Sequence, residues 1–272
     1  MNRLTADTVR WTLIGLLSFK VMAQNPAAKP ALSLPQAVLA AWNDIELRQI
    51  GIAEVFPEDN YSFKLVQAQS SFGDHCIGTW ATAPQPFLPG SLQNFRNQSL
   101  RLIVHTSAGG RKVRIKISNT FGDHPLRIGG AHIARRTVEA DIDPTSDRAL
   151  IFNGHASTTV PARSMVVSDP VELDVPALSD LAISLFLPEA TEASTSHILA
   201  MQTSYVSAVG DSTAAVKFPV AKTIDSWPFL TGVDVATSPR GVAIVAFGSS
   251  LTDGDGTTSD TNGRWPDVLA ER

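Results

Sequence analysis

The stretch "KVRIKIS", Lys112–Ser118, decides the class of fold that this sequence favours. Val113, Ile115 and Ile117 alternate with charged or polar residues, so an extended chain would direct all three apolar side chains to one face. One buried face and one wetted face are typical of an antiparallel strand. The segments "VELDV" (171–175) and "LAISLFL" (181–187) repeat the alternation.

Further apolar segments extend this pattern on both sides of the central stretch. They read "SLRLIVHTS", "LRIGGAHIA", "RALIFNG" and "SMVVSD", and turn-forming sequences such as "SAGGR" and "DIDPTSD" separate them. About eight strands without intervening helices predict an antiparallel β-sandwich of jelly-roll type. We place this module at residues 77–238 and call it the β-module.

The N-terminal residues 1–23 are predicted to be a signal peptide. Arg3 and Arg10 precede a short apolar core, "WTLIGLLSF", and Ala23 provides a small residue for cleavage. The core is too short to span a bilayer, so we expect a secreted or periplasmic protein. A partly buried N-terminal helix is the alternative. Residues 24–76 are expected to form a Pro/Ala-rich linker and a short helix.

Composition excludes several classes of partner and cofactor. The net charge is −4 and no basic run is present, so no nucleic-acid partner is expected. Cys76 is the single cysteine, which rules out an intramolecular disulfide but is compatible with export. No Cys or His spacing suits zinc. The segment "DGDGTTSDTNGR" (253–264) starts like a calcium loop but has Thr258 where glycine is needed and Arg264 where glutamate is needed. We therefore expect no metal and no organic cofactor.

The pattern changes near the C-terminal end. "GVAIVAFG" (241–248) is a continuous apolar run, which is typical of a strand covered on both faces in a parallel α/β sheet. "RWPDVLAER" (264–272) predicts the start of a helix with Pro266 in its first turn. Residues 239–272 are therefore expected to form the first βα unit of a second domain.

The loop between these two elements carries the reactive residue types. "FGSSLTDG" (247–254) resembles the first sequence block of the GDSL esterases, in the SGNH hydrolase superfamily, which reads G-D-S-hydrophobic-T/S-D-G after an apolar strand. "NGRWPDVLAER" resembles the first helix of that family. The segments from "IGTWATAPQPF" to "SWPFLTGVDV" resemble the β-rich module that precedes the catalytic domain in one bacterial subgroup. The resemblance implies an α/β, flavodoxin-like hydrolase domain acting on carboxylic esters.

The resemblance assigns roles to four residues. The nucleophile falls on Ser250, whose backbone N–H would be one oxyanion donor. Asp253 matches the second acid of the block, which is expected to hold the loop by hydrogen bonds, and Gly248 opens the block. Ser249 replaces the first aspartate, so Ser249 stays open as a second, less favoured nucleophile. The implied substrate is a small-molecule or polysaccharide ester, and the intermediate an acyl-enzyme.

The later blocks of the family are missing from the residues that follow Ser250. Those blocks supply a Gly and an Asn for the oxyanion hole and a D-x-x-H pair, and no His follows Ser250 here. We therefore expect this chain to be the N-terminal part of a longer polypeptide, or a truncated reading frame, and to be inactive alone. The upstream histidines are expected to be surface or turn residues: His75, His105, His124, His132, His155 and His197.

A non-catalytic function is the alternative hypothesis. A β-sandwich with exposed tryptophans could bind carbohydrate or another surface, and the C-terminal segment would then be a vestigial hydrolase fragment. Trp80, Trp227 and Trp265 are the candidates for such a surface. Burial of these side chains in a core or at a domain boundary is the competing interpretation. The sequence leaves the oligomeric state open.

Overall fold

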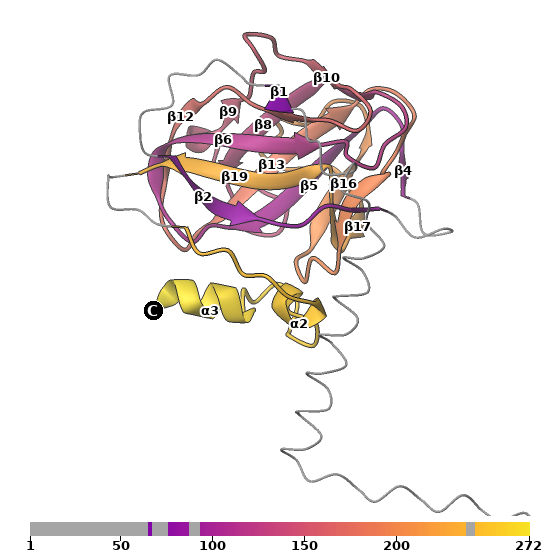
Figure 1. The fold of residues 1–272 in the computed structure, drawn as a ribbon. Coiled ribbons are helices and arrows are strands. Elements are labelled where there is room, and N and C mark those ends of the chain that lie inside the picture. Colours follow the sequence, from indigo (N-terminus) through magenta and orange to yellow (C-terminus); the bar gives the residue numbers. More distant parts are fainter. Residues whose placement is uncertain (1–64, 67–75, 87–92, 238–242) are drawn as a thin grey trace, which may run out of the picture. The chain divides into compact units, whose positions relative to one another are not determined.

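The computed structural model describes residues 65–66, 76–86, 93–237 and 243–272. The predicted signal peptide and almost all of the predicted linker and short helix lie outside the described residues. The chain divides into two units, Met1–Glu54 and Val55–Arg272, and all that follows concerns the second unit (Figure 1).

The first sheet is built around β6 (Gly110–Ser118). β6 pairs antiparallel with its neighbours on both sides. The strand order is β1 (Leu65–Val66), β11 (Met165–Val167), β6, β19 (Leu230–Ala236) and β2 (Cys76–Ala81), with β12 (Val171–Val175) also paired to β6. β1 and β11 form a parallel pair, although neighbouring strands elsewhere in this sheet are antiparallel.

The second sheet is built around β5 (Gln98–His105) and β13 (Asp180–Leu187), which pair antiparallel along their full lengths. The strand order is β17 (Val220–Ile224), β16 (Ser204–Val209), β5, β13, β8 (Gly130–Arg135) and β9 (Arg148–Ala149). β5 thus lies between two strands that are far from it in sequence. The fold depends on long-range pairing rather than on consecutive hairpins.

Short strands form three smaller sheets, separate from the two large ones. β7 (Leu126–Ile128) pairs with β10 (Thr158–Val160), and β4 (Asn94–Phe95) pairs with β14 (Thr191–Glu192). A third group has the order β18 (Ser226–Pro228), β15 (Thr195–Ile198), β3 (Gln85–Pro86). The one-turn 3₁₀ helix η2 spans Pro144–Ser146. β15 carries His197.

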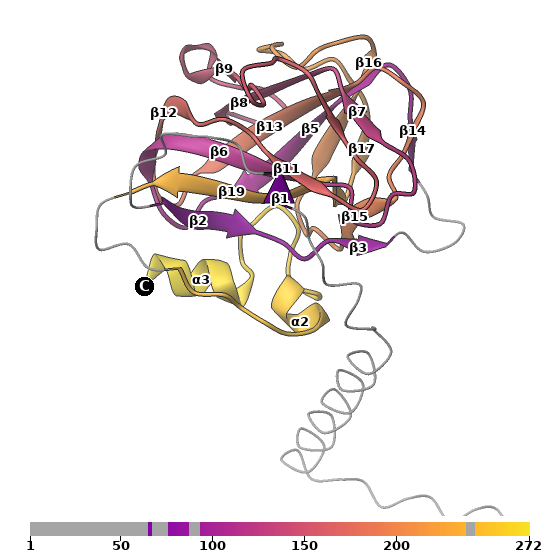
Figure 2. The same cartoon turned by 45° about the horizontal axis from the view of Figure 1, so that its top comes forward.

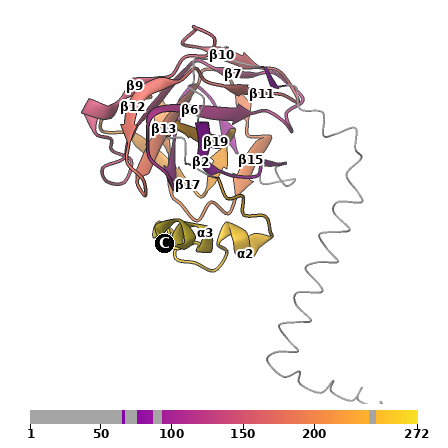
Figure 3. The same cartoon turned by 60° about the vertical axis from the view of Figure 1, so that its left-hand side comes forward.

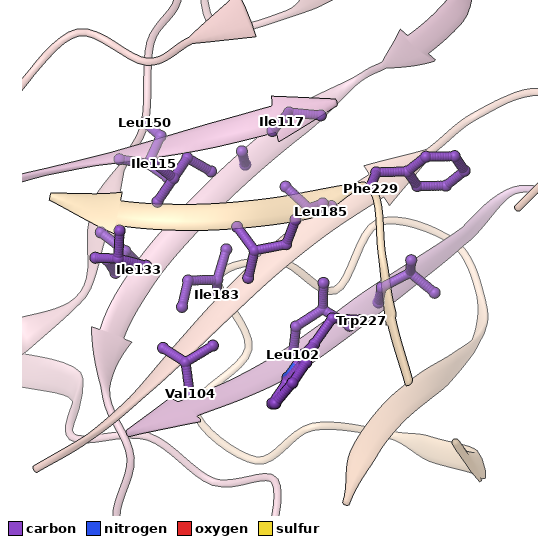
Figure 4. Packing of buried hydrophobic residues seen from close by; sticks show 14 of the residues in the cluster. Leu102, Val104, Ile115, Ile117, Ile133, Leu150, Ile183, Leu185, Trp227 and Phe229 are labelled. Atoms are coloured by element: carbon purple, nitrogen blue, oxygen red, sulfur yellow. The ribbon is translucent and has the colours of Figure 1, made fainter. Parts of the chain in front are cut away.

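One hydrophobic core lies between the two large sheets. Ile115 and Ile117 of β6 and Ile183 and Leu185 of β13 are fully buried and belong to a single cluster. Figure 4 shows these side chains entering the same space from the two sheets. The predicted antiparallel β class is confirmed, and so is the register in which Val113, Ile115 and Ile117 face the core.

The outer face of the second sheet is also covered, which the sequence pattern did not reveal. Arg101 of β5 is fully buried there. Its guanidinium donates to Ser184 Oγ at 2.9 Å and to the carbonyl oxygens of Ala140 and Ala215 at 2.8 Å each, and it lies 4.4 Å from the centre of the Phe218 ring. Burial lowers the pKa of Arg101 to about 10, so it stays charged at neutral pH and its hydrogen bonds hold two loops on the sheet.

The predicted strand at 241–248 is not found in its described part. Residues 243–248 form no ladder with any described strand, and Ile244, Val245 and Phe247 are 75%, 86% and 90% exposed. A strand forms only where another strand accepts and donates its backbone hydrogen bonds, and no described strand lies beside this segment. The prediction of a buried strand is therefore wrong for the structure as described.

The predicted C-terminal helix is present. α3 spans Trp265–Glu271, with Pro266 in its first turn, and the short helix α2 spans Ser250–Asp253. Figures 1 and 3 both show α2 and α3 outside the two sheets of the β-module. No helix in the described part of the chain has the length and apolar character needed to cross a membrane.

Candidate functional site

Ser250 is the first residue of α2 and is exposed to solvent. The first amides of a helix have no acceptor within it, so the backbone N–H of Ser250 is free of intrahelical bonding. Ser249 precedes the helix as its N-cap, in an extended conformation, and its side chain makes no capping hydrogen bond. The two serines therefore differ: Ser250 presents its side chain at a helix start, and Ser249 is partly buried in the turn before it.

Position 248 requires a glycine because the Thr252 side chain lies very close to its backbone. A Cβ atom at this position would lie 3.0 Å from the Cβ of Thr252 and closer still to its Oγ1. Any larger residue would have to displace Thr252, one turn further along. The close contact with Thr252 thus gives a physical reason for a glycine at position 248.

Within the described residues the Asp253 side chain makes no hydrogen bond to its own loop, whereas the resemblance had implied that it holds the loop in this way. Its Oδ1 instead lies 3.4 Å from His197 Nε2, on β15 of the β-module. Figure 2 shows β15 and β3 on the side of the β-module where α2 lies. Burial raises the pKa of the Asp253 carboxyl, and the charges of His197 and Arg264 partly oppose that rise.

His197 is a core residue and not the surface or turn residue that the sequence predicted. Its side chain is 3% exposed. The ring lies 5.7 Å from that of Trp227, with a 30° angle between the planes, and Nδ1 lies 2.8 Å from the carbonyl oxygen of Ala83. The sequence around residue 197 does not indicate this burial. β15 pairs with β3 and β18, which come from distant parts of the sequence.

A second contact fixes the Ser250 loop, which we define as residues 248–264. The Asp260 carboxylate accepts hydrogen bonds from Gln202 Nε2 at 2.7 Å and from the Thr203 backbone N–H and Oγ1 at 2.6 Å each. The Asp260 N–H donates to the Met201 carbonyl at 3.1 Å. Four hydrogen bonds at one residue place the far half of the loop firmly on the β-module.

Arg264 closes the loop over a buried tryptophan. Its Nε donates to Asp267 at 2.7 Å, its Nη1 donates to the Ala200 carbonyl at 3.2 Å, and its guanidinium carbon lies 5.6 Å from the Trp227 ring centre. Trp227 and Trp80 pack edge to face in the core, with 2% and 9% exposure. Neither offers a face for a sugar ring, so of the three candidates only the half-exposed Trp265 is open to solvent.

The described residues supply Ser250 with no general base. No hydrogen bond of the described part of the chain joins Ser250 Oγ to a histidine or a carboxylate, and His197 faces Asp253 instead. Within the same residues, nowhere do three or more His, Cys, Asp or Glu side chains gather as metal ligands would. The arrangement is an exposed serine at a helix start, on a loop attached to the β-module.

An open groove of about 680 Å³ lies elsewhere on the β-module. Side chains of both positive and negative charge line the groove. The aromatic and charged lining residues include Phe95, Arg96, Phe121, Arg127, Glu189 and Glu192. None of the four residues assigned by the resemblance lines this groove. The mixed charge favours no single class of ligand.

Comparison with known proteins gives no independent assignment. No protein-family model matches the chain, and a search of curated proteins finds no match.

Proposed function

We propose that this chain carries the nucleophile of an exported carboxylic-ester hydrolase of the GDSL type, and that Ser250 is that nucleophile. One observation carries the proposal. Ser250 is exposed at the first position of α2 and follows an apolar segment. In the same loop Gly248 leaves room for the Thr252 side chain, and Asp253 contacts His197 of the β-module. Ser249, partly buried and extended, is the weaker candidate.

The proposed chemistry is acyl transfer through serine. Ser250 Oγ attacks the ester carbonyl carbon as its proton passes to a base, and the resulting oxyanion accepts a hydrogen bond from the Ser250 N–H. Collapse expels the alcohol and leaves an acyl-enzyme, which water hydrolyses to release the acid. No described residue makes a hydrogen bond to Ser250 Oγ, and in the family that the block resembles a D-x-x-H pair supplies the base.

The β-module is proposed to act as the platform for the nucleophile loop. Support comes from the contacts at Asp253, Asp260 and Arg264, all of which join the loop to the β-module. The substrate class remains a small-molecule or polysaccharide ester. Export through cleavage after Ala23 belongs to the same proposal.

Hydrolysis of a short activated ester tests this function. In a polypeptide that also carries the later blocks, Ser250→Ala should reduce kcat/KM by about 10⁴-fold, because the attacking oxygen is gone. Ser249→Ala is the matched control and should retain most of the rate. A large loss in Ser249→Ala with an active Ser250→Ala would move the nucleophile to the neighbouring residue and overturn the assignment.

A further inference from the structure

On the basis of that proposed function, we infer that His197 is a positioning residue for Ser250. It holds the Ser250 loop on the β-module through Asp253 and one proton shared by the two side chains. We call this contact the His197–Asp253 latch.

The hydrogen-bonding requirements of the His197 ring lead to the shared proton. Nδ1 lies 2.8 Å from the carbonyl oxygen of Ala83, and a carbonyl oxygen only accepts, so Nδ1 must carry a hydrogen. In a neutral imidazole Nε2 then presents a lone pair. Asp253 Oδ1 lies 3.4 Å from that nitrogen. Two acceptors at this distance attract one another only when a proton sits on Nε2 or on the carboxyl group.

Few other charges act on the pair. Among the described residues, Arg264 is the cation whose charge acts on Asp253, and its Nε donates a hydrogen bond to Asp267 at 2.7 Å. β3 and β18, the strands that flank β15, contribute Gln85, Pro86, Ser226, Trp227 and Pro228, none of which carries a charge. The buried imidazole at 3% exposure and the carboxyl at 30% therefore depend mainly on each other.

The latch acts on Ser250 through α2. Asp253 lies three residues after Ser250, and its backbone N–H donates to the Ser249 carbonyl at 3.2 Å, while Asp255 N–H donates to the Ser250 carbonyl at 2.9 Å. Anchoring the Asp253 side chain therefore fixes the turn on which Ser250 sits. Asp260 anchors the far half of the loop independently, so loss of the latch should loosen α2 and leave the far half of the loop in place.

The direction of the pH dependence follows from the raised pKa of Asp253. A carboxyl group whose pKa is raised by docking favours the docked state below its ordinary pKa, and this contribution is lost as the pH rises through the raised value. Once the pair has lost its shared proton, a carboxylate faces the Nε2 lone pair. The latch should thus be closed in acid and should weaken as the pH rises.

Amide hydrogen exchange of the 272-residue chain, corrected for intrinsic rates, tests the latch without any catalytic readout. Protection of the Asp253 and Asp255 amides should fall about tenfold across a pH series that begins below the ordinary carboxyl pKa and ends where the pair has lost its shared proton. Asp253→Asn should remove this dependence, because its Nδ2 can donate to Nε2 at every pH. Asp253→Ala should give low protection throughout. The Asp260 amide should stay protected in all forms.

The exchange profiles also separate the latch from a contact that needs no shared proton. Equal, pH-independent protection in the parent chain and in Asp253→Ala would overturn the latch, and so would a parent-like pH dependence in Asp253→Asn. Ser250→Ala should leave the exchange profile unchanged. If the ester test fails while this profile holds, the hydrolase proposal falls and the latch remains a structural contact; if the profile fails alone, Ser250 keeps its assignment and His197 loses its role.

Discussion

Arg264 packs directly over Gly254. A Cβ atom on Gly254 would lie 2.9 Å from Arg264 Cδ and closer still to Cγ, and Gly254 ends α2 with φ at 94°. The same arginine donates to the Ala200 carbonyl and faces the Trp227 ring. The end of α2 and the start of α3 are therefore joined at one point on the β-module.

Gly254→Ala should loosen the Ser250 loop. Gly254 has a left-handed backbone conformation, which a residue with a side chain disfavours, and the added Cβ would also clash with Arg264. Together the two effects should cost about 2–3 kcal/mol of loop stability. Limited proteolysis of residues 250–264 should therefore be faster. Gly256→Ala is the matched control, since Gly256 also has a positive φ, at 85°, but no atom within 4 Å of its Cβ position. Equal effects of the two substitutions would show that Arg264 does not restrain the loop.

Ile115→Asp should destabilise the β-module by several kcal/mol. Ile115 has 0% exposure between the two sheets, and a carboxylate there would have no partner. The midpoint of denaturant unfolding should fall sharply. Ile151→Asp, at a position with 36% exposure, should change the midpoint little. An unchanged midpoint for Ile115→Asp would contradict the register of β6.

Arg101→Met should cost about 3–5 kcal/mol of unfolding free energy. It leaves Ser184 Oγ and the carbonyl oxygens of Ala140, Thr213 and Ala215 without their buried donor. Arg111→Met, at an exposed position of β6, removes the same charge from the surface and should be nearly neutral. Similar unfolding curves for the two variants would show that the buried hydrogen bonds contribute little.

Asp180→Asn should reduce stability at neutral pH by about 1–2 kcal/mol. Although burial raises the pKa of Asp180, the hydrogen bonds and charges of His105 and Arg136 more than offset it, and the pKa is lowered. The stabilisation is thus present above the ordinary carboxyl pKa and is lost as the pH falls through the lowered value. The variant should show a flatter stability profile in acid, whereas Asp174→Asn, at an exposed position, should follow the parent chain.

The alternation of apolar and polar residues predicted those strands that have one buried and one solvent-exposed face. In β6 the pattern gave both the class of structure and the buried set, because one side of that strand faces the core and the other faces solvent. The pattern did not predict strands that are buried on both faces, such as β5. Nothing in the stretch "SLRLIVHTS" indicated that Arg101 is buried, because two distant loops cover it and accept its hydrogen bonds.

The candidate site was predictable only in part. The block "FGSSLTDG" pointed to Ser250 and to Asp253, but the partner of Asp253 is a histidine 56 positions away in the sequence, on β15. No local pattern encodes such a contact. The prediction of a buried strand from the run "VAIVAF" was wrong for a different reason. Apolar composition leads to burial only where other elements cover the segment, and no described element covers this one. The jelly-roll connectivity of the β-module stays a prediction.

Identification of the residue that reacts with a fluorophosphonate tests the central claim most directly. In a polypeptide that carries the later blocks after Arg272, peptide mass mapping should find the adduct on Ser250, retained in Ser249→Ala and absent in Ser250→Ala. The 272-residue chain should react only slowly, because a serine without a base is a weak nucleophile near neutral pH. An adduct on Ser249, or ester hydrolysis that persists without Ser250, would contradict the account.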